Sequence, residues 1–170
     1  MKYLLLLFFG YSFGQNIAIN EIDEFTKNHI IQVNCSKNKE WKTSDNILKG
    51  IFNNGFLSLK NIKTKEMSLN ILQLNTQLGF SVCTSNYKSK IIILFSDNST
   101  LEIKNTNEII CSTNILNTFH ITNEEINTLC NKQFKKIRIY TTDGYLDFEI
   151  KEKSIDMIKK TFILYKNTTL

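Results

Sequence analysis

The chain has 170 residues, of which 42% are hydrophobic and 22% charged, and its formal net charge is +5. This length fits one domain whose core is stable without a disulfide framework, so several domains are not expected. Arg138 is the only arginine among the 21 basic residues. Arginine is the residue that binds phosphate or guanine through two parallel hydrogen bonds, so the chain has almost no side chains for such contacts. The charge predicts a solvated lysine surface and no nucleic-acid partner.

The N-terminus has the three regions of a secretory signal peptide. Lys2 supplies a positive charge, residues 3–9 are apolar, and small residues precede a polar stretch that begins at Gln15. The apolar run is shorter than the roughly 20 residues that span a bilayer, so a signal anchor is the less favoured alternative. We predict a signal peptide at residues 1–14, a single β-rich domain at residues 15–170, and a secreted or periplasmic protein without a transmembrane segment after cleavage.

The cysteines all lie in the part of the chain that would be exported, where disulfides persist. They are Cys35, Cys83, Cys111 and Cys130. No two have the Cys-x-x-Cys spacing of a zinc ribbon or a redox pair. Three connectivities are open, and because the core is large enough without a framework we expect at most one disulfide. Cys130 lies on the apolar face of an expected helix, and two alternatives stay open for it: a buried free thiol or a disulfide.

The first half of the chain predicts strands joined by turns without proline. Residues 15–20 resemble a flexible lead, and residues 22–34 predict a first strand. Residues 41–49 fit a strand or a loop. The Asn54-Gly55 pair between apolar residues is typical of a tight hairpin turn, with strands at residues 47–52 and 56–62.

The middle of the chain continues the strand pattern. Alternation over residues 67–74 changes phase near Leu72, which indicates a bulge, and residues 79–83 predict a separate strand. Asp97-Asn98 predicts a two-residue turn that places Leu94 opposite Leu101 and Ile92 opposite Ile103. A three-residue turn with Phe95 opposite Leu101 is the alternative. Residues 108–115 and 116–121 predict two further short strands.

Two helices are expected in the last third. Thr122 followed by Glu125 has the spacing of a capping box and predicts a helix that ends near Asn131. The final helix is expected to begin with Ser154 as its cap. Its apolar stripe predicts packing on the sheet rather than on a membrane surface, and comprises Ile155, Ile158, Phe162 and Tyr165.

Between these helices, Asp143-Gly144 predicts a two-residue hairpin turn. This register places Arg138 opposite Glu149 and Ile139 opposite Phe148. Alternation sorts the apolar residues onto one face, comprising Ile137, Ile139, Thr141, Leu146, Phe148 and Ile150. Hairpins followed by helices predict an α+β fold, mainly an antiparallel β-sheet or a half-open barrel, with a short helix and a C-terminal helix packed on it.

Catalytic and metal-binding motifs are not evident. The only histidines are His29 and His120, too few for a multi-histidine metal site. No nucleophile elbow or phosphate-binding glycine loop occurs. A Cys-His pair, such as Cys111 with His120 or Cys83 with His29, stays open. We therefore expect a protein that is not an enzyme and has no cofactor and no metal.

The run from Phe134 to Lys153, with residues 121–126 before it, resembles the C-terminal part of small, uncharacterised secreted proteins of Bacteroidetes-type bacteria. The Phe13-Gly14-Gln15 sequence is also similar to the end of signal peptides in those bacteria. The resemblance covers about a third of the chain and implies export from a bacterial cell. It implies no activity and no catalytic residues.

The polar face of the expected hairpin is the candidate partner surface, because it carries the only arginine together with two tyrosines, residue types that dominate binding energy at interfaces. Its residues are Arg138, Tyr140, Thr142, Tyr145, Asp147 and Glu149. The predicted function is a non-enzymatic exported protein that binds a macromolecular or cell-envelope partner. The alternative is a carrier of a small apolar ligand with a pocket inside the curved sheet, and an unrecognised hydrolase comes third.

Overall fold

The computed structural model describes residues 15–35, 41–43, 54–84, 89–106 and 108–170. The predicted signal peptide at residues 1–14 and the predicted strand at residues 47–52 lie outside these ranges. The described elements, in chain order, are β1 (Gln15–Ile22), β2 (His29–Cys35), β3 (Trp41–Thr43), β4 (Asn54–Lys63), β5 (Ser68–Thr84), β6 (Lys90–Phe95), β7 (Thr100–Lys104), β8 (Ile110–His120), α1 (Asn123–Asn131), β9 (Phe134–Tyr140), β10 (Tyr145–Ile150) and α2 (Glu152–Thr169).

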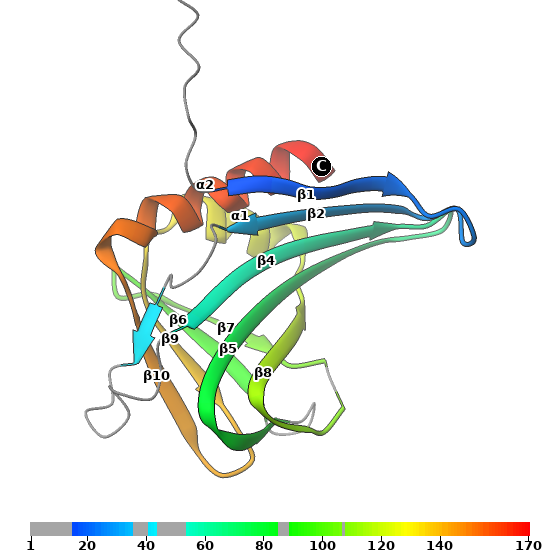
Figure 1. Ribbon diagram of the computed structural model, residues 1–170. Helices are drawn as coiled ribbons and strands as arrows, with labels where there is room; N and C mark the ends of the chain where they lie inside the picture. Colours follow the sequence, from blue (N-terminus) through cyan, green and yellow to red (C-terminus); the bar gives the residue numbers. More distant parts are fainter. Residues whose placement is uncertain (1–14, 36–40, 44–53, 85–88, 107) are drawn as a thin grey trace, which may run out of the picture.

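The strands form two antiparallel five-stranded sheets. The first has the order β1-β2-β4-β5-β8, and the second has the order β3-β10-β9-β6-β7. In Figure 1 the long strands of the first sheet run side by side and curve past the helices, and the second sheet lies below them. One apolar core joins both sheets and both helices. The predicted α+β class with a mainly antiparallel sheet is confirmed.

Several strand boundaries differ from those that the sequence pattern predicts. Residues 15–20 belong to β1 and are not a lead, because they pair with β2 across the turn at residues 23–28. Asn54 and Gly55 do not form a turn, since they pair with Gln77 and Thr76 inside the first sheet. These corrections have one physical cause: turn-forming residues are held extended when a neighbouring strand supplies hydrogen bonds.

Two pairs of predicted short strands are each one long strand. β5 runs from Ser68 to Thr84 without the break expected before residue 79, and its irregularity against β8 lies between Gln77 and Val82 rather than at Leu72. β8 likewise joins the two strands expected over residues 108–121. The two long strands pair with each other, and β8 forms one edge of the first sheet.

The helix α1 begins as predicted. The Thr122 hydroxyl accepts a hydrogen bond from the Glu125 N–H (3.1 Å), and the Glu125 carboxylate accepts one from the Thr122 N–H (2.7 Å). Ile126, Leu129 and Cys130 are buried on its inner face. The capping box and the apolar stripe were sufficient to predict this helix, because both depend only on residues that are close in sequence.

The helix α2 begins earlier than predicted and packs, as predicted, on the sheets. Its N-cap is Lys151, without a side-chain cap, and Ser154 lies inside the first turn. Phe162 stacks on Phe134 of β9 with ring centroids 5.7 Å apart, and Phe134 meets Phe95 edge-on at the same separation. The helix packs chiefly against β2 of the first sheet, and the aromatic cluster connects it to β9 of the second sheet, so α2 contacts both sheets.

A buried polar network holds the C-terminal end of α2. The Tyr165 hydroxyl lies 2.8 Å from the Asn70 Oδ1 atom and 3.1 Å from the Lys60 carbonyl oxygen. Asn61 of β4 also donates to Asn70, at 2.8 Å. Burial raises the pKa of Tyr165, so the hydroxyl keeps its proton and serves as a donor.

The β6–β7 turn has the three-residue length of the alternative prediction, but its register differs from both predicted registers. Phe95 donates to the carbonyl of Ser99, and Asn98 has φ +63°, so the loop is Ser96-Asp97-Asn98, the three-residue type that ends on a left-handed residue. Ile93 therefore lies opposite Leu101, and Ile91 opposite Ile103. The predicted pairs of Leu94 with Leu101 and Ile92 with Ile103 are wrong by one residue.

This turn carries a charged cluster that should make the free energy of unfolding depend on pH in the acidic range. The Asp97 carboxylate accepts a hydrogen bond from the Ser99 hydroxyl and forms an ion pair with Lys132 at 3.0 Å. Hydrogen bonds from Ser99 and Lys132 lower the pKa of Asp97 from 3.8 to about 2. A carboxyl group with a lowered folded pKa stabilises the protein above its unfolded pKa, and this contribution disappears as the pH falls through the folded pKa.

We therefore expect the free energy of unfolding to fall between pH 3.8 and about 2. Denaturant unfolding at a series of pH values measures the fall, and NMR titration of the carboxyl group assigns it. Ser99→Ala should move the pKa of Asp97 upward while keeping the ion pair with Lys132. An Asp97 carboxyl that titrates at its ordinary value in the wild-type protein would refute this assignment.

Candidate functional site

The predicted partner surface lies on the second sheet, on the face opposite the core. Ile137, Ile139 and Phe148 are almost fully buried, whereas Arg138, Tyr140 and Tyr145 are half-buried or exposed. The alternation of faces that the hairpin sequence predicted is therefore confirmed. We call the side chains of β10, β9, β6 and β7 that point away from the core the outer face, and they include Tyr145, Asp147, Glu149, Lys136, Arg138, Tyr140, Lys90, Ile92, Leu94, Thr100 and Glu102.

The predicted register of this hairpin is wrong by two residues. Tyr140 lies opposite Tyr145, and Arg138 lies opposite Asp147 rather than Glu149. The Thr141 N–H donates to the Gly144 carbonyl, which closes a four-residue loop, and Gly144 has φ +154°, where glycine is favoured. A shift of two residues keeps every side chain on its predicted face, because the side-chain period of a strand is two.

Thr142 is the one predicted surface residue that is not part of the outer face. Its N–H and its hydroxyl both reach the carbonyl oxygen of Cys83 in β5, at 3.0 and 3.3 Å. These hydrogen bonds fasten the hairpin turn to the first sheet. Thr142 therefore positions the hairpin and is not available as the surface contact that the sequence predicted.

Arg138 and Asp147 form the centre of the outer face. The guanidinium Nε and Nη2 atoms donate to the two carboxylate oxygens at 2.7 and 2.8 Å. These bonds lower the pKa of Asp147, and burial opposes them. The two side chains are 36% and 19% exposed, so the pair is partly screened and contributes about 1 kcal/mol.

Aromatic rings hold the arginine from the other side. The guanidinium carbon lies 3.9 Å from the centroid of the Tyr145 ring, and the Tyr145 and Tyr140 rings are 5.9 Å apart. Lys90, which is paired with Glu102 at 2.8 Å, lies 5.2 Å from the centroid of the Tyr140 ring. Cation–π contacts of this kind favour a defined orientation of the ring and of the cationic side chain.

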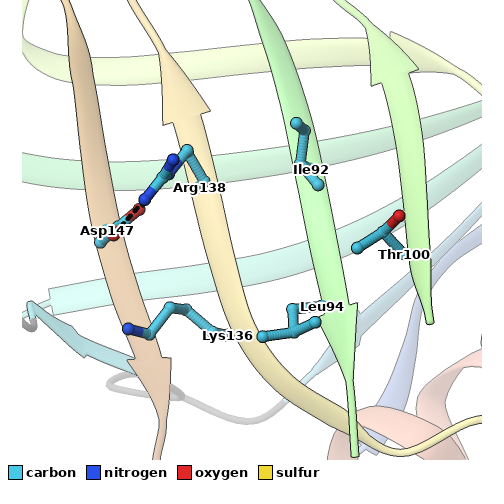
Figure 2. Close-up of a pocket in the computed structure, with 6 residues that line it drawn as sticks. All are labelled: Ile92, Leu94, Thr100, Lys136, Arg138 and Asp147. Carbon is cyan, nitrogen blue, oxygen red and sulfur yellow. Dashed lines mark hydrogen bonds and ion pairs between the residues drawn. The ribbon is translucent and has the colours of Figure 1, made fainter. Parts of the chain in front are cut away.

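A shallow depression of about 180 Å³ lies beside the ion pair, as Figure 2 shows. Its lining residues are Ile92, Leu94, Thr100, Lys136, Arg138 and Asp147. Pockets for small-molecule ligands usually measure about 300–1,000 Å³, so this one is too small for a typical ligand. It has room for one side chain of a partner between an apolar floor and charged walls.

Sequence reasoning missed the floor of this depression. Ile92 and Leu94 were expected opposite Ile103 and Leu101, whose side chains face the core, but Ile92 and Leu94 are only half-buried and lie on the outer face. The run Ile91 to Phe95 is apolar throughout, so it contains no alternation that assigns a face. The three-residue loop with its left-handed Asn98 was the one signal that could have corrected the register.

The other chemistry-bearing residues do not converge. Cys83 and Cys111 are joined in a disulfide, so neither is the thiol nucleophile that a pairing with His29 or His120 would need. Cys35 and Cys130 are buried and form no disulfide, which confirms the expectation of at most one. Within the described ranges, no group of three or more His, Cys, Asp or Glu side chains could hold a metal ion.

The fold and the site together define an α+β protein with two antiparallel sheets and an exposed tyrosine-arginine face. Comparison of the chain with protein-family models, with curated proteins and with solved structures finds no match. Among the described residues, no helix is long and apolar enough to cross a membrane. A functional assignment therefore depends on the outer face itself.

Proposed function

We propose that this chain is a non-enzymatic exported protein that binds a macromolecular partner, a protein or a cell-envelope component, through the outer face of its second sheet. The observation that carries the proposal is the fixed arginine. Arg138 is held by two hydrogen bonds to Asp147 and by the Tyr145 ring, directly beside a depression with an apolar floor.

Preorganisation is what makes this arrangement suitable for binding. Immobilising a long side chain at an interface costs roughly 0.5–1.5 kcal/mol, and the contacts to Asp147 and Tyr145 have already restricted Arg138 in the unbound protein. Tyrosine and arginine are also the residue types most enriched at energetic hot spots. A partner could place one apolar side chain over Ile92 and Leu94 and contact the exposed edge of Tyr145.

Export is supported by two independent features. The first is the signal-like sequence of residues 1–14. The second is the disulfide between Cys83 and Cys111, a bond that persists in oxidising compartments and is rare in reducing ones. Both features favour a secreted or periplasmic location, in agreement with the resemblance to secreted bacterial proteins.

The carrier alternative receives less support from the described residues. The depression lies on the outside of the second sheet, not inside the curved first sheet, and it is smaller than a ligand pocket. Nucleic acid is also a poor candidate, because the only arginine has its fork occupied by Asp147. The outer face therefore favours a macromolecular partner other than nucleic acid.

The test uses the tyrosines, because Arg138→Ala would leave the half-buried Asp147 carboxylate without its guanidinium partner and would disturb folding as well as binding. A photoreactive group in place of Tyr145 would cross-link the partner in an envelope extract, and mass spectrometry would identify it. Titration of that partner with purified variants then measures the binding. We expect Tyr140→Ala/Tyr145→Ala to weaken it by about 2 kcal/mol or more.

Ile163→Ala is the control, because Ile163 is exposed on α2, away from the outer face. This variant should bind the partner like the wild-type protein. Both variants should keep the wild-type melting temperature. A dissociation constant that does not change in the double tyrosine variant would reject the outer face as the binding surface.

A further inference from the structure

The far end of the first sheet carries three exposed apolar side chains on two adjacent hairpin turns. Phe25 is 93% exposed, Ile22 is 65% exposed and Met67 is 57% exposed. Phe25 lies in the β1–β2 turn and Met67 in the β4–β5 turn. The two turns are neighbours because β2 pairs with β4 up to His29 and Lys63. In Figure 1 both turns project past the helices, and we call this end of the sheet the apolar tip.

The β1–β2 turn is internally bonded in a way that presents Phe25 to the solvent. The Asp23 carboxylate accepts hydrogen bonds from the N–H groups of Phe25 and Thr26, at 3.1 and 2.6 Å, and from the Thr26 hydroxyl at 2.7 Å. The Lys27 N–H donates to the Asp23 carbonyl. These hydrogen bonds order the backbone of the turn, while its largest side chain, Phe25, is exposed to solvent.

The second turn is built in a similar way. The Thr64 hydroxyl accepts hydrogen bonds from the N–H groups of Glu66 and Met67, at 3.1 and 3.0 Å. The Thr64 N–H donates to the Met67 carbonyl at 2.8 Å. Two ordered turns therefore hold Phe25, Ile22 and Met67 at one convex end of the molecule.

The size of the apolar tip argues against a protein partner. One aromatic side chain buries about 150–250 Å², so Phe25, Ile22 and Met67 together offer roughly 400 Å². A stable protein–protein interface needs about 800 Å² from each partner. The residues that surround the three apolar side chains are charged, and they include Glu24, Lys27, Lys65 and Glu66. A second protein would therefore gain only about half of the area that it needs.

A bilayer surface does not have this limitation, since lipid flows around a convex tip and needs no matching surface. The apolar side chains would enter the boundary between headgroups and acyl chains, and the charged neighbours would stay at headgroup level. Three lysines, Lys27, Lys63 and Lys65, are balanced there by Asp23, Glu24 and Glu66. Binding should therefore come mainly from apolar burial and change little with the charge of the lipid.

From this geometry we propose that the apolar tip is a peripheral docking site for a lipid bilayer, separate from the outer face of the second sheet. Phe25 is its main contact, with Ile22 and Met67 beside it. The site anchors the protein reversibly, because three side chains bury far less apolar surface than a membrane-spanning segment.

Co-flotation with phosphatidylcholine vesicles, prepared with and without phosphatidylglycerol, tests the proposal. We expect the wild-type protein to float with both kinds of vesicle, and Phe25→Ser to reduce the partition coefficient about tenfold or more. Ile22→Ser should reduce it by a smaller factor. All variants are compared in the same chain after export, so that any contribution from the N-terminal segment cancels.

Ile109→Ser is the matched control for Ile22→Ser. Ile109 is 67% exposed, close to the value for Ile22, but it lies next to β8 at the opposite end of the first sheet. The control should float like the wild-type protein, and all melting temperatures should be unchanged. Flotation that is unaffected by Phe25→Ser, or reduced equally by Ile109→Ser, overturns the proposal. So does self-association through Phe25 in the absence of vesicle binding.

Discussion

Replacing Phe162 with alanine is expected to lower the free energy of unfolding by about 3–5 kcal/mol. Phe162 is fully buried on α2 and stacks on Phe134 of β9, which in turn contacts Phe95 of β6. The substitution removes an aromatic ring from a cluster that joins α2 to the second sheet. Because α2 also covers β2 of the first sheet, the loss weakens the contact between the two sheets as well as the helix.

Denaturant unfolding followed by circular dichroism measures this effect. The neighbouring Ile163→Ala is the matched control, since Ile163 lies on the same helix but is exposed. Exposed substitutions usually change stability by less than about 0.5 kcal/mol. Equal losses in the two variants would show that the aromatic cluster does not join helix and sheet as described.

Removal of the disulfide with Cys83→Ser/Cys111→Ser is expected to cost about 3–4 kcal/mol. The two cysteines lie opposite each other on β5 and β8 and are separated by 28 residues in the chain. The bond restricts the unfolded chain, and in the folded state it pins the strands just beyond the irregularity between Gln77 and Val82. The Cys83 carbonyl also accepts a hydrogen bond from the Thr142 N–H. The position of the β9–β10 turn therefore depends on the same end of β5.

Reductant provides the control for this prediction. It should destabilise the wild-type protein by about as much as the double substitution does, and should leave the double variant unchanged. Thiol counting on the denatured, non-reduced protein should find two thiols, those of Cys35 and Cys130. Four thiols in the denatured, non-reduced protein, or a reductant effect that is the same in both proteins, would contradict the assignment.

The local features of the structure could be predicted from the sequence because their causes are local. The capping box of Thr122 and Glu125 needs only three residues of spacing. The faces of β9 and β10 follow from alternation, which placed Arg138 and Tyr140 on the outer face even though the register was wrong by two residues.

The candidate site required the tertiary structure, because its parts come from strands that are distant in sequence. Arg138 pairs with Asp147 and not with the predicted Glu149, because the hydrogen bond between Thr141 and Gly144 closes a loop that is longer than the predicted turn. The floor of the depression is formed by side chains of β6. The apolar run of this strand is unbroken, so its sequence pattern does not show which side chains face the core.

The sequence alone determined the fold class, the start of α1 and the face of the sheet on which each residue of the β9–β10 hairpin lies. Propensity, capping and strand alternation, which carry this information, act over a few neighbouring positions. The tertiary structure decided the register of both hairpins, the pairing of Cys83 with Cys111, and the sheet that α2 covers. These choices depend on hydrogen bonds and packing between segments far apart in the chain. Only the folded arrangement shows which of several compatible partners each segment meets.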